Sequence, residues 1–336
     1  MKPFDFLAIG DITTDAFIRL KDASVHCNVN RDGCELCMKF ADKIPFEFVE
    51  IVSAVGNGPN AAVSAARLGL KSASMCDIGN DQNGKDCLTS LKKNGVATKF
   101  VRVHRGQKTN YHYVLWFEDE RTILVKHEKF ARTFAPPRRN PRYVYLTSLG
   151  EDSIDYQLEI AKWLEKNPEI KFSFQPGTFQ MSAGYEKLLP LYKRTDIFFC
   201  NVEESKRILK KDAVDGSTPE GIKELLAGMH AIGPKVVVIT DGPRGAYAFD
   251  GSETWFMPTY PDPKPPYERT GAGDAFASTF TVALALGKSV SEALQWGPIN
   301  SMSVVQEIGA QKGLLTRNKL EEFLKNAPAE YKPRKI

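Results

Sequence analysis

Short apolar runs alternate with longer amphipathic stretches along most of the chain. The apolar runs are Phe4–Ile9, Ser72–Ile78, Tyr143–Leu146, Ile170–Phe174, Ile197–Cys200 and Lys235–Thr240. Apolar residues at helical spacing lie between and after them, at Asn60–Leu70, Gln82–Lys93, Ile154–Glu165, Val202–Leu209, Pro219–Ile232, Ala272–Leu286, Val290–Gln306 and Arg317–Lys325. Because strands that alternate with helices usually form a covered parallel sheet, we expect an α/β fold with a central, mainly parallel sheet flanked by helices.

Two segments depart from this alternation. Residues 12–55 contain little helical periodicity, and Lys108–Lys126 has the pattern of a hairpin that turns at Glu118–Glu120. We expect these segments, about 12–55 and 108–126, to form a small β lid beside the main sheet. No internal repeat or low-complexity linker divides the 336 residues, which predicts a single domain spanning 1–336.

Composition narrows the class of protein. Lys and Arg total 45 against 41 Asp and Glu, and the net charge of +4 is too small to indicate a nucleic-acid partner. No apolar run approaches the ~18 residues of a membrane span, and the first residues, MKPFDFLAIGD, lack the apolar core of a signal peptide. The six cysteines suit a reducing compartment. We therefore expect a cytoplasmic protein without nucleic-acid or membrane partners.

The most informative motif is ERTGAGDAF at residues 268–276, directly before an apolar helical stretch. Glycines let backbone N–H groups approach a phosphate closely, and a helix N-terminus adds partial positive charge. Asp274 would stand beside this anion site, where it can take a proton from a hydroxyl that attacks phosphorus. The alternative is that Thr270 and Asp274 only cap a helix after a glycine turn.

Two motifs in the first sixty residues suit an acceptor. The sequence VGNGPN at 55–60 places the amides of Asn57 and Asn60 at a helix start, where they can hold sugar hydroxyls or a phosphate. Asp15 ends the sequence GDITTD, which follows the first strand, and ligands of open α/β sheets bind beyond the carboxyl ends of strands. The alternatives are an ordinary helix cap and a turn aspartate.

Two later motifs suit a nucleotide. Asn201 and Glu204 lie on one face of a helix start, where they can organise water around a magnesium–phosphate group; a capping box is the alternative. The sequence TDGPRG at 240–245 is a glycine loop after an apolar strand, of the kind that passes close to phosphates. A tight hairpin turn is the alternative for this loop.

Taken in order, these motifs resemble the ribokinase-like, or PfkB, family of carbohydrate and nucleoside kinases, over almost the whole chain. The resemblance implies a ribokinase-like three-layer fold, ATP as co-substrate, Mg²⁺ as cofactor and a lid that excludes water from the acceptor. It implies that Asp274 is the catalytic base and that the amides of Gly271, Ala272 and Gly273 form the anion hole. The implied acceptor contacts are Asp15, Gly56, Asn57 and Asn60. The implied nucleotide contacts are Asn201, Glu204, Thr240, Gly242, Gly245 and Asn300, with Glu204 holding Mg²⁺ through water.

The chain departs from the family pattern at three places. Glu268–Arg269 stands where the family often has Asp-Thr, and that Asp belongs to a monovalent-cation site in many members, so potassium activation is not carried over to this chain. Arg269 would bring a positive charge to the phosphoryl site, or lie exposed in a loop. Val55–Gly56 replaces a frequent pair of glycines, and Gln175 precedes Pro-Gly where the family often has Asp or Asn.

The first lid segment contains a cluster of metal-ligand residue types, His26, Cys27, Cys34 and Cys37, in the sequence HCNVNRDGCELC. A hairpin that turns at Asn30–Gly33 would bring Cys27 near Cys34. We therefore consider a zinc site formed by Cys27, Cys34 and Cys37, against free or redox-active thiols as the default.

The acceptor depends on residues that no motif fixes. Aromatic residues on the second lid hairpin suit a nucleobase or a buried hairpin face, and they are Tyr111, Tyr113, Trp116 and Phe117. The basic loop FAPPRRNPR, with Arg138, Arg139 and Arg142, suits an acceptor phosphate or a solvated loop. We expect a sugar kinase that prefers ribose or a related furanose, then a nucleoside kinase, then a non-catalytic sensor. A homodimer through the β lid is a further hypothesis.

Overall fold

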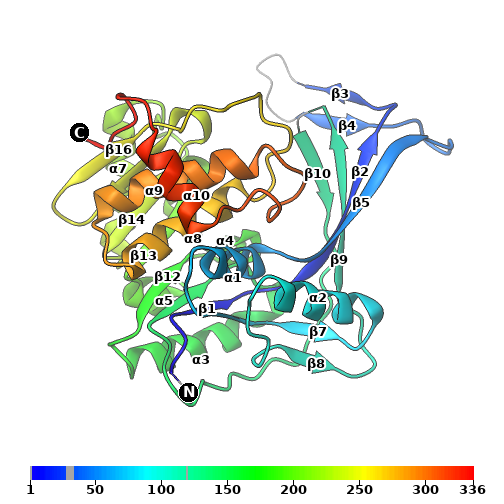
Figure 1. The fold of residues 1–336 in the computed structure, drawn as a ribbon, viewed down its shortest axis with the longest axis horizontal. Coiled ribbons are helices and arrows are strands. Elements are labelled where there is room, and N and C mark those ends of the chain that lie inside the picture. The colour runs from blue at the N-terminus through cyan, green and yellow to red at the C-terminus, as the bar shows by residue number, and fades with distance from the viewer. Residues whose placement is uncertain (1, 28–33, 119) are drawn as a thin grey trace.

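A nine-stranded sheet forms the centre of the molecule (Figure 1) in the computed structural model, which describes residues 2–27, 34–118 and 120–336. In spatial order its strands are β17 (Arg334–Lys335), β16 (Thr254–Met257), β15 (Ala246–Phe249), β14 (Val236–Thr240), β13 (Ile197–Asn201), β12 (Lys171–Phe174), β11 (Tyr143–Leu146), β1 (Phe6–Ile9) and β6 (Ser72–Met75). Strands β14 to β6 in this order pair in parallel. Strands β15, β16 and β17 add an antiparallel edge. The expected α/β fold with a mainly parallel sheet is confirmed.

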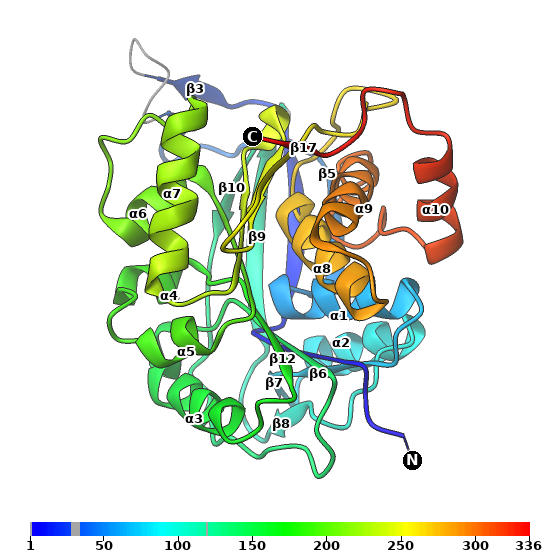
Figure 2. The same ribbon diagram turned by 90° about the vertical axis from the view of Figure 1, so that its left-hand side faces the viewer.

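Helices cover both faces of this sheet (Figure 2). The helices are α1 (Asn57–Arg67), α2 (Gln82–Lys93), α3 (Ile154–Glu165), α4 (Thr178–Ala183), α5 (Leu189–Arg194), α6 (Val202–Leu209), α7 (Pro219–Ile232), α8 (Ala272–Ala285), α9 (Val290–Val304) and α10 (Arg317–Lys325). Buried residues of α1, α2, α8, α9 and α10 share one core, and those of α3, α5, α6 and α7 share the other. The sheet therefore lies between two helical layers.

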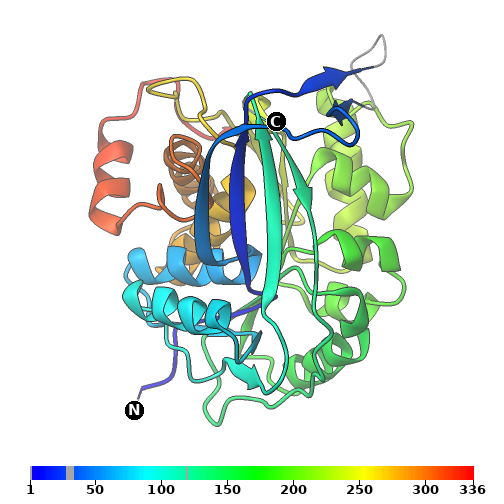
Figure 3. The ribbon, with the colours of Figure 1, turned by 90° about the vertical axis from the view of Figure 1, so that its right-hand side faces the viewer.

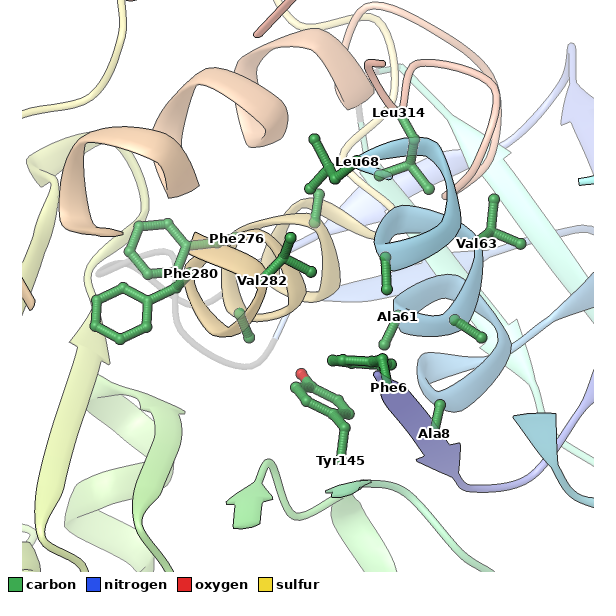
Figure 4. Packing of buried hydrophobic residues seen from close by; sticks show 14 of the residues in the cluster. Phe6, Ala8, Ala61, Val63, Leu68, Tyr145, Phe276, Phe280, Val282 and Leu314 are labelled. Atoms are coloured by element: carbon green, nitrogen blue, oxygen red, sulfur yellow. The ribbon is translucent and has the colours of Figure 1, made fainter. Parts of the chain in front are cut away.

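The alternation of side chains along the strands separates these two cores. Phe6 and Ala8 of β1 belong to the core that contains α1 and α8, whereas Leu7 and Ile9 belong to the opposite core. Figure 4 shows the first core from close by, with the ring of Phe6 beside that of Tyr145. Because both faces of these strands are buried, they read as continuous apolar runs rather than as alternating patterns.

A second sheet stands along the side of the main body (Figure 3). Its strands, in spatial order, are β10 (Glu120–Leu124), β9 (Asn110–Phe117), β2 (Thr13–Leu20) and β5 (Phe46–Val55). Two small sheets accompany it, one of β3 (Ser24–His26) with β4 (Glu35–Cys37), the other of β7 (Asp77–Gly79) with β8 (Arg102–His104). The predicted hairpin over 108–126 is confirmed as β9 and β10, and segment 12–55 contributes β2 and β5.

Most helix boundaries follow the sequence prediction, but α1 begins three residues earlier, at Asn57. Asn57 and Gly58, which the sequence places at the helix start, occupy the first turn of the helix. The antiparallel strands β15 and β16 were not predicted, because four-residue strands between turn residues carry little periodic signal. In the described part of the chain, no helix is long and apolar enough to cross a membrane.

The cysteine-rich segment differs from the expectation. Cys27 and Cys34 lie together as predicted, but they form a disulfide, and Cys37 is a half-buried free thiol. Disulfide sulfurs do not ligate metal, and residues 2–27, 34–118 and 120–336 contain no group of three or more His, Cys, Asp or Glu able to hold an ion. The disulfide contradicts the zinc site of Cys27, Cys34 and Cys37, and of the default, free or redox-active thiols, it contradicts free thiols at 27 and 34. The turn expected at Asn30–Gly33 lies outside the described residues.

We expect a maleimide to label one thiol per native, non-reduced chain, that of Cys37. Cys76, Cys87 and Cys200 are buried, and burial raises the pKa of each thiol, to about 11 for Cys87, so that little reactive thiolate forms. Intact-mass spectrometry before and after mild reduction measures the adducts, and reduction should add Cys27 and Cys34. Three adducts without reductant would contradict the disulfide.

Candidate active site

The predicted motifs follow neighbouring strands of the main sheet at their carboxyl ends. The sequence GDITTD follows β1, Gln175 follows β12, Asn201 ends β13 and Thr240 ends β14. Because these strands are parallel, their carboxyl ends share one edge of the sheet, where ligands of open α/β sheets bind. Helices α1 and α8 bring their N-terminal residues to the same edge, since side chains of α1 contact Asp274 of α8.

Asp274 is held by three amide side chains from two segments, Asn57 and Asn60 of α1 and Gln175 after β12. Nδ2 of Asn57 donates to Oδ1 at 2.8 Å, Nδ2 of Asn60 donates to Oδ2 at 2.8 Å, and Nε2 of Gln175 lies 3.4 Å from Oδ1. Burial raises the pKa of Asp274, and the donated hydrogen bonds oppose this by stabilising the carboxylate. No cation among the described residues pairs with Asp274. The carboxylate is therefore fixed in orientation but not neutralised, which suits a proton acceptor.

The N-terminus of α8 lies beside this carboxylate. Gly271 is the N-cap residue with φ +82°, and a Cβ there would lie 2.2 Å from the Cβ of Ala310, so the position requires glycine. A Cβ at Gly273 would meet only open space and the amide of Gln175 at 4.0 Å. The first N–H groups of a helix have no partner within the helix, so this open turn can receive an anion. Asp274 is in the same first turn.

A second network fixes Asn60. Nε2 of Gln311 donates to Oδ1 of Asn60 at 2.9 Å and to the carbonyl of Ala54 at 2.7 Å. The Asn60 amide is thereby oriented with its N–H groups toward Asp274. Gly56 has φ +106°, and a Cβ there would lie 2.6 Å from the carbonyl oxygen of Asp11, which brings the two acceptor motifs into backbone contact.

Asp15 on β2 lies beside His112 on β9. The side chain of Asp15 is 9% exposed, and its Oδ1 lies 3.4 Å from Nδ1 of His112 without hydrogen-bond geometry. Both Oδ1 of Asp15 and Nε2 of His112 are buried without a hydrogen-bond partner among the described residues. The ring of His112 lies 5.2 Å from that of His127. Buried polar atoms usually have a hydrogen-bond partner, so Oδ1 of Asp15 and Nε2 of His112 fit a site that binds a hydroxyl ligand.

Arg132 links this region to three carboxylates. Its side chain is 3% exposed, with Nη2 at 2.7 Å from Asp11, Nη1 at 2.7 Å from Asp152 and Nε at 3.5 Å from Asp77. Asp11 also accepts from the backbone of Gly150 at 2.7 Å. These charges raise the pKa of Arg132, against the lowering effect of burial. Two of the three guanidinium nitrogens thus donate to carboxylates of the protein, and Nε has an ion-pair distance to Asp77 but no hydrogen bond to a described residue.

The residues predicted for the nucleotide lie at the ends of β13 and β14. Asn201 and Glu204 form the capping box that was the structural alternative, with reciprocal distances of 2.8 and 2.9 Å. Burial raises the pKa of Glu204, and the charge of Asp274 raises it further. Thr240 pairs with Ala246 at the end of β14, and Gly242 and Gly245 adopt φ +52° and +112° in the loop that follows.

Asn300 does not reach this edge. Its side chain is fully buried, donates to Oγ1 of Thr279 at 2.7 Å and accepts from the backbone of Leu315 at 2.9 Å. The amide of Asn300 is used in joining α8, α9 and the segment before α10, while the hydroxyl of the next residue, Ser301, donates to the carbonyl of Ala272 at 2.7 Å. A nucleotide contact by this stretch stays a prediction.

Glu268 and Arg269 have separate environments. Glu268 is fully buried and accepts at Oε1 from the backbone and the hydroxyl of Thr270, at 2.7 and 2.5 Å. Its Oε2 lies 3.3 Å from the backbone nitrogen of Gly309. Arg269 lies 3.7 Å from Glu120 on β10, so its charge faces the second sheet.

Sequence reasoning missed the roles of Gln175, His112, His127 and Arg132. Gln175 was noted only as a departure, although its place directly after a strand was a usable signal. The others come from the second sheet and from the segment after β10, and their approach to Asp11 and Asp15 depends on long-range packing. The basic residues Arg138, Arg139 and Arg142 do not serve the acceptor, since they precede β11 at its amino end.

Comparison with known proteins places this site in a family. The family model "pfkB family carbohydrate kinase" matches residues 52–317. A ribokinase from Bacillus subtilis is 29% identical over 280 residues, 80% of this chain and 87% of the relative; one from Mus musculus is 30% identical over 261 residues, 76% and 79%. The structure of Arabidopsis thaliana ribokinase complexed with ribose and ATP superposes with TM-score 0.80 at 22% identity, over 96% of this chain and 99% of that one. The fold is accordingly ribokinase-like.

Proposed function

Because the chain belongs to the pfkB family of carbohydrate kinases, we propose that it transfers the γ-phosphoryl group of ATP to a hydroxyl of ribose or a related furanose. The observation that carries this proposal is the position of Asp274, which lies in the first turn of α8 and is held at both oxygens by Asn57 and Asn60. The same turn offers unpaired backbone N–H groups for the transferring phosphoryl group.

Each residue of the site has a role in this reaction. The acceptor oxygen attacks the γ-phosphorus, its proton passes to a carboxylate oxygen of Asp274, and the bond from the γ-phosphorus to the bridging oxygen breaks to release ADP. The amides of Gly271, Ala272 and Gly273 stabilise the charge on the phosphoryl oxygens. Thr240, Gly242 and Gly245 line the nucleotide, whose leaving phosphates lie beyond the ends of β13 and β14.

Glu204 is the residue that suits magnesium. Its Oε2 is engaged by the backbone of Asn201, whereas Oε1 makes no hydrogen bond to a described residue. Mg²⁺ prefers ionised carboxylate oxygens as ligands, and it commonly keeps several of its water molecules. Glu204 can therefore hold the ion through a bound water rather than by direct contact. Bound magnesium would neutralise charge on the β- and γ-phosphates. Glu204 orients the helix start in either protonation state through its capping bond.

The charges around Asp15 favour a neutral acceptor. Asp11 and Asp15 face this region, and the cation that lies against Asp11 is Arg132, which is shared with Asp77 and Asp152. Among the described residues, no Lys or Arg other than Arg132 pairs with Asp11 or Asp15, so a carboxylate or phosphate on the acceptor would meet these acidic groups without a further Lys or Arg to receive it. A sugar hydroxyl, in contrast, can donate to Oδ1 of Asp15 and pair with Nε2 of His112, the two orphaned atoms.

A nucleoside remains the second candidate. The rings of His127 and Phe179 lie 5.5 Å apart beside Asp11, and those of Tyr111 and Tyr113 lie 5.2 Å apart on β9. Such rings could stack on a base. Trp116 is fully buried against Tyr267 and is not available for this purpose.

We further propose that β2, β5, β9 and β10 act as the lid of one domain spanning 1–336, and that two chains associate through this sheet. The sheet exposes large apolar side chains, among them Phe46, Ile51 and Leu124, with 54, 60 and 52% of their surface accessible. Light scattering coupled to size exclusion should give twice the chain mass, and Ile51→Lys should return it to the monomer. A monomeric wild type would contradict the association.

The pH profile tests Asp274 as the base. Asp274 must be ionised to accept a proton, and because burial raises its pKa, kcat/KM should fall as acidification protonates it. Asn57→Ala removes a hydrogen bond that stabilises the carboxylate, so the acid limb should move to higher pH. The quantity to compare is the pH at which kcat/KM falls to half, not the maximum kcat/KM, since Asn57 is also an expected acceptor contact and its loss can lower that maximum. An unmoved limb would exclude Asp274 as the titrating group.

A screen of ATP consumption distinguishes the candidate functions. We expect turnover with ribose and related free sugars, and at least tenfold lower kcat/KM with sugar phosphates, sugar acids and nucleosides at matched concentration. Nucleosides preferred tenfold over every free sugar would favour the second candidate. ATP binding without turnover across the panel would instead support a non-catalytic sensor.

A further inference from the structure

A basic pocket lies on the edge of the main sheet opposite to the candidate active site. Its volume is about 220 Å³, and five cationic side chains line it: Lys2, Lys71, Lys99, Arg138 and Arg139. Lys71 directly precedes β6 and the two arginines precede β11, so the pocket lies at the amino ends of these strands, near the chain end marked N in Figures 1–3. Asp274 and the glycine turn lie beyond the carboxyl ends, at least the ~13 Å length of a four-residue strand away.

Aromatic rings hold two of these cations in place. The Lys71 and Lys99 ammonium groups lie 4.9 and 4.7 Å from the centre of the Phe4 ring, and Lys99 also lies 4.5 Å from that of Phe100. Nζ of Lys71 donates to the carbonyl of Lys2 at 2.7 Å. The Phe4 ring thus keeps two positive charges at the pocket, where each can be paired by a bound anion.

The protein supplies little negative charge of its own here. In the described ranges, no ion pair with a carboxylate involves Lys2, Lys71, Lys99 or Arg138. Asp5 is the acidic residue at the margin, and its two oxygens already accept from the backbone of Lys71 at 3.0 Å and from Arg142 at 3.2 Å. The positive charge of Lys2, Lys71, Lys99 and Arg138 is therefore largely uncompensated by described carboxylates.

We propose that this pocket binds a small molecule that carries a diphosphate or longer phosphate group. Lysine ammonium groups act as point charges toward phosphate, and arginine can bind it with two parallel hydrogen bonds. The four cations Lys2, Lys71, Lys99 and Arg138 exceed what a single orthophosphate would neutralise, and the volume of about 220 Å³ admits a diphosphate but not an extended polymer. The site is separate from the ATP site in the proposed function and does not depend on that function.

The test is calorimetric titration with inorganic pyrophosphate in the absence of nucleotide, because the triphosphate of an ATP analogue would itself compete for the pocket. We expect about one site per chain, with at least tenfold weaker binding in the Lys71→Gln/Lys99→Gln double variant. The control Lys85→Gln/Lys223→Gln removes the same charge from exposed helical positions and should bind like the wild type. Arg138→Gln, in an exposed loop, provides a second variant should the double variant fail to fold, and should also weaken binding.

Several outcomes would overturn the proposal. They are an absence of pyrophosphate binding by the wild type, and equal binding by the wild type and a folded Lys71→Gln/Lys99→Gln variant. Orthophosphate that binds as tightly as pyrophosphate would overturn the assignment of a diphosphate. A single-stranded oligonucleotide that binds at least ten times more tightly than pyrophosphate, and loses this on the same substitutions, would replace the small anion with a nucleic acid.

Discussion

Asp274→Asn is expected to lower kcat by about 10²–10⁴ while the chain keeps its fold and its affinity for ATP. The substitution removes the proton acceptor but preserves the shape of the side chain between Asn57 and Asn60. The raised pKa of Asp274 means that the folded state binds this proton more tightly than the unfolded state does. The ionised form therefore costs stability as the pH rises through that pKa, and a neutral Asn avoids this cost.

Steady-state kinetics with Mg-ATP and ribose, together with calorimetric titration of ATP, measure the effect of Asp274→Asn. Asp155→Asn is the matched control, because Asp155 is an exposed carboxylate on α3, and it should leave kcat unchanged. A folded Asp274→Asn variant with more than about a tenth of the wild-type kcat would remove Asp274 from the role of general base.

Arg132→Met is expected to destabilise the protein by about 3–5 kcal/mol, the usual cost of breaking a buried ion-pair network from one side. The loss leaves Asp11 and Asp77 buried without their shared cation, with only His127, Arg102, His104 and backbone donors nearby. The same change should weaken acceptor binding, since Asp11 lies in backbone contact with Gly56.

Urea unfolding followed by fluorescence measures this free energy. Arg105→Met replaces an exposed arginine without an ion pair among the described residues and should change the unfolding free energy by no more than about 0.5 kcal/mol. Arg132→Lys keeps the charge but not the three-way geometry, so its loss should be intermediate. Equal stability of the Arg132→Met and Arg105→Met variants would show that the network contributes little.

The fold was predictable where local pattern and tertiary structure agree. Helices α2, α3, α6, α7 and α10 have the predicted ends, because apolar spacing and capping residues mark them in the sequence. The edge strands β15 to β17 were missed, since each is defined by its pairing with the strand before it in the sheet, β15 with β14, β16 with β15 and β17 with β16, rather than by a pattern of its own. Such pairing is not visible in a local window of sequence.

The residues of the candidate site likewise include some that local sequence indicates and others that depend on tertiary packing. Gly271 and Asp274 could be singled out from the sequence because glycines before an apolar helix permit a tight turn, and the N-terminus of that helix can bind an anion. The environment of Asn300 could not be predicted, because its assignment came from resemblance alone, whereas its hydrogen bonds depend on how α8 and α9 pack. The link between Arg132 and Asp11 crosses 121 positions, and no spacing rule connects residues so far apart.

The most direct test of the proposed reaction is identification of its products. With ribose and ATP labelled with ¹⁸O at the γ-phosphoryl oxygens, mass spectrometry should find one labelled ribose phosphate for each ADP formed, and Asp274→Asn should suppress both together. ADP accompanied by labelled orthophosphate alone, or no ADP with any free sugar while ATP binds, would contradict phosphoryl transfer to a sugar.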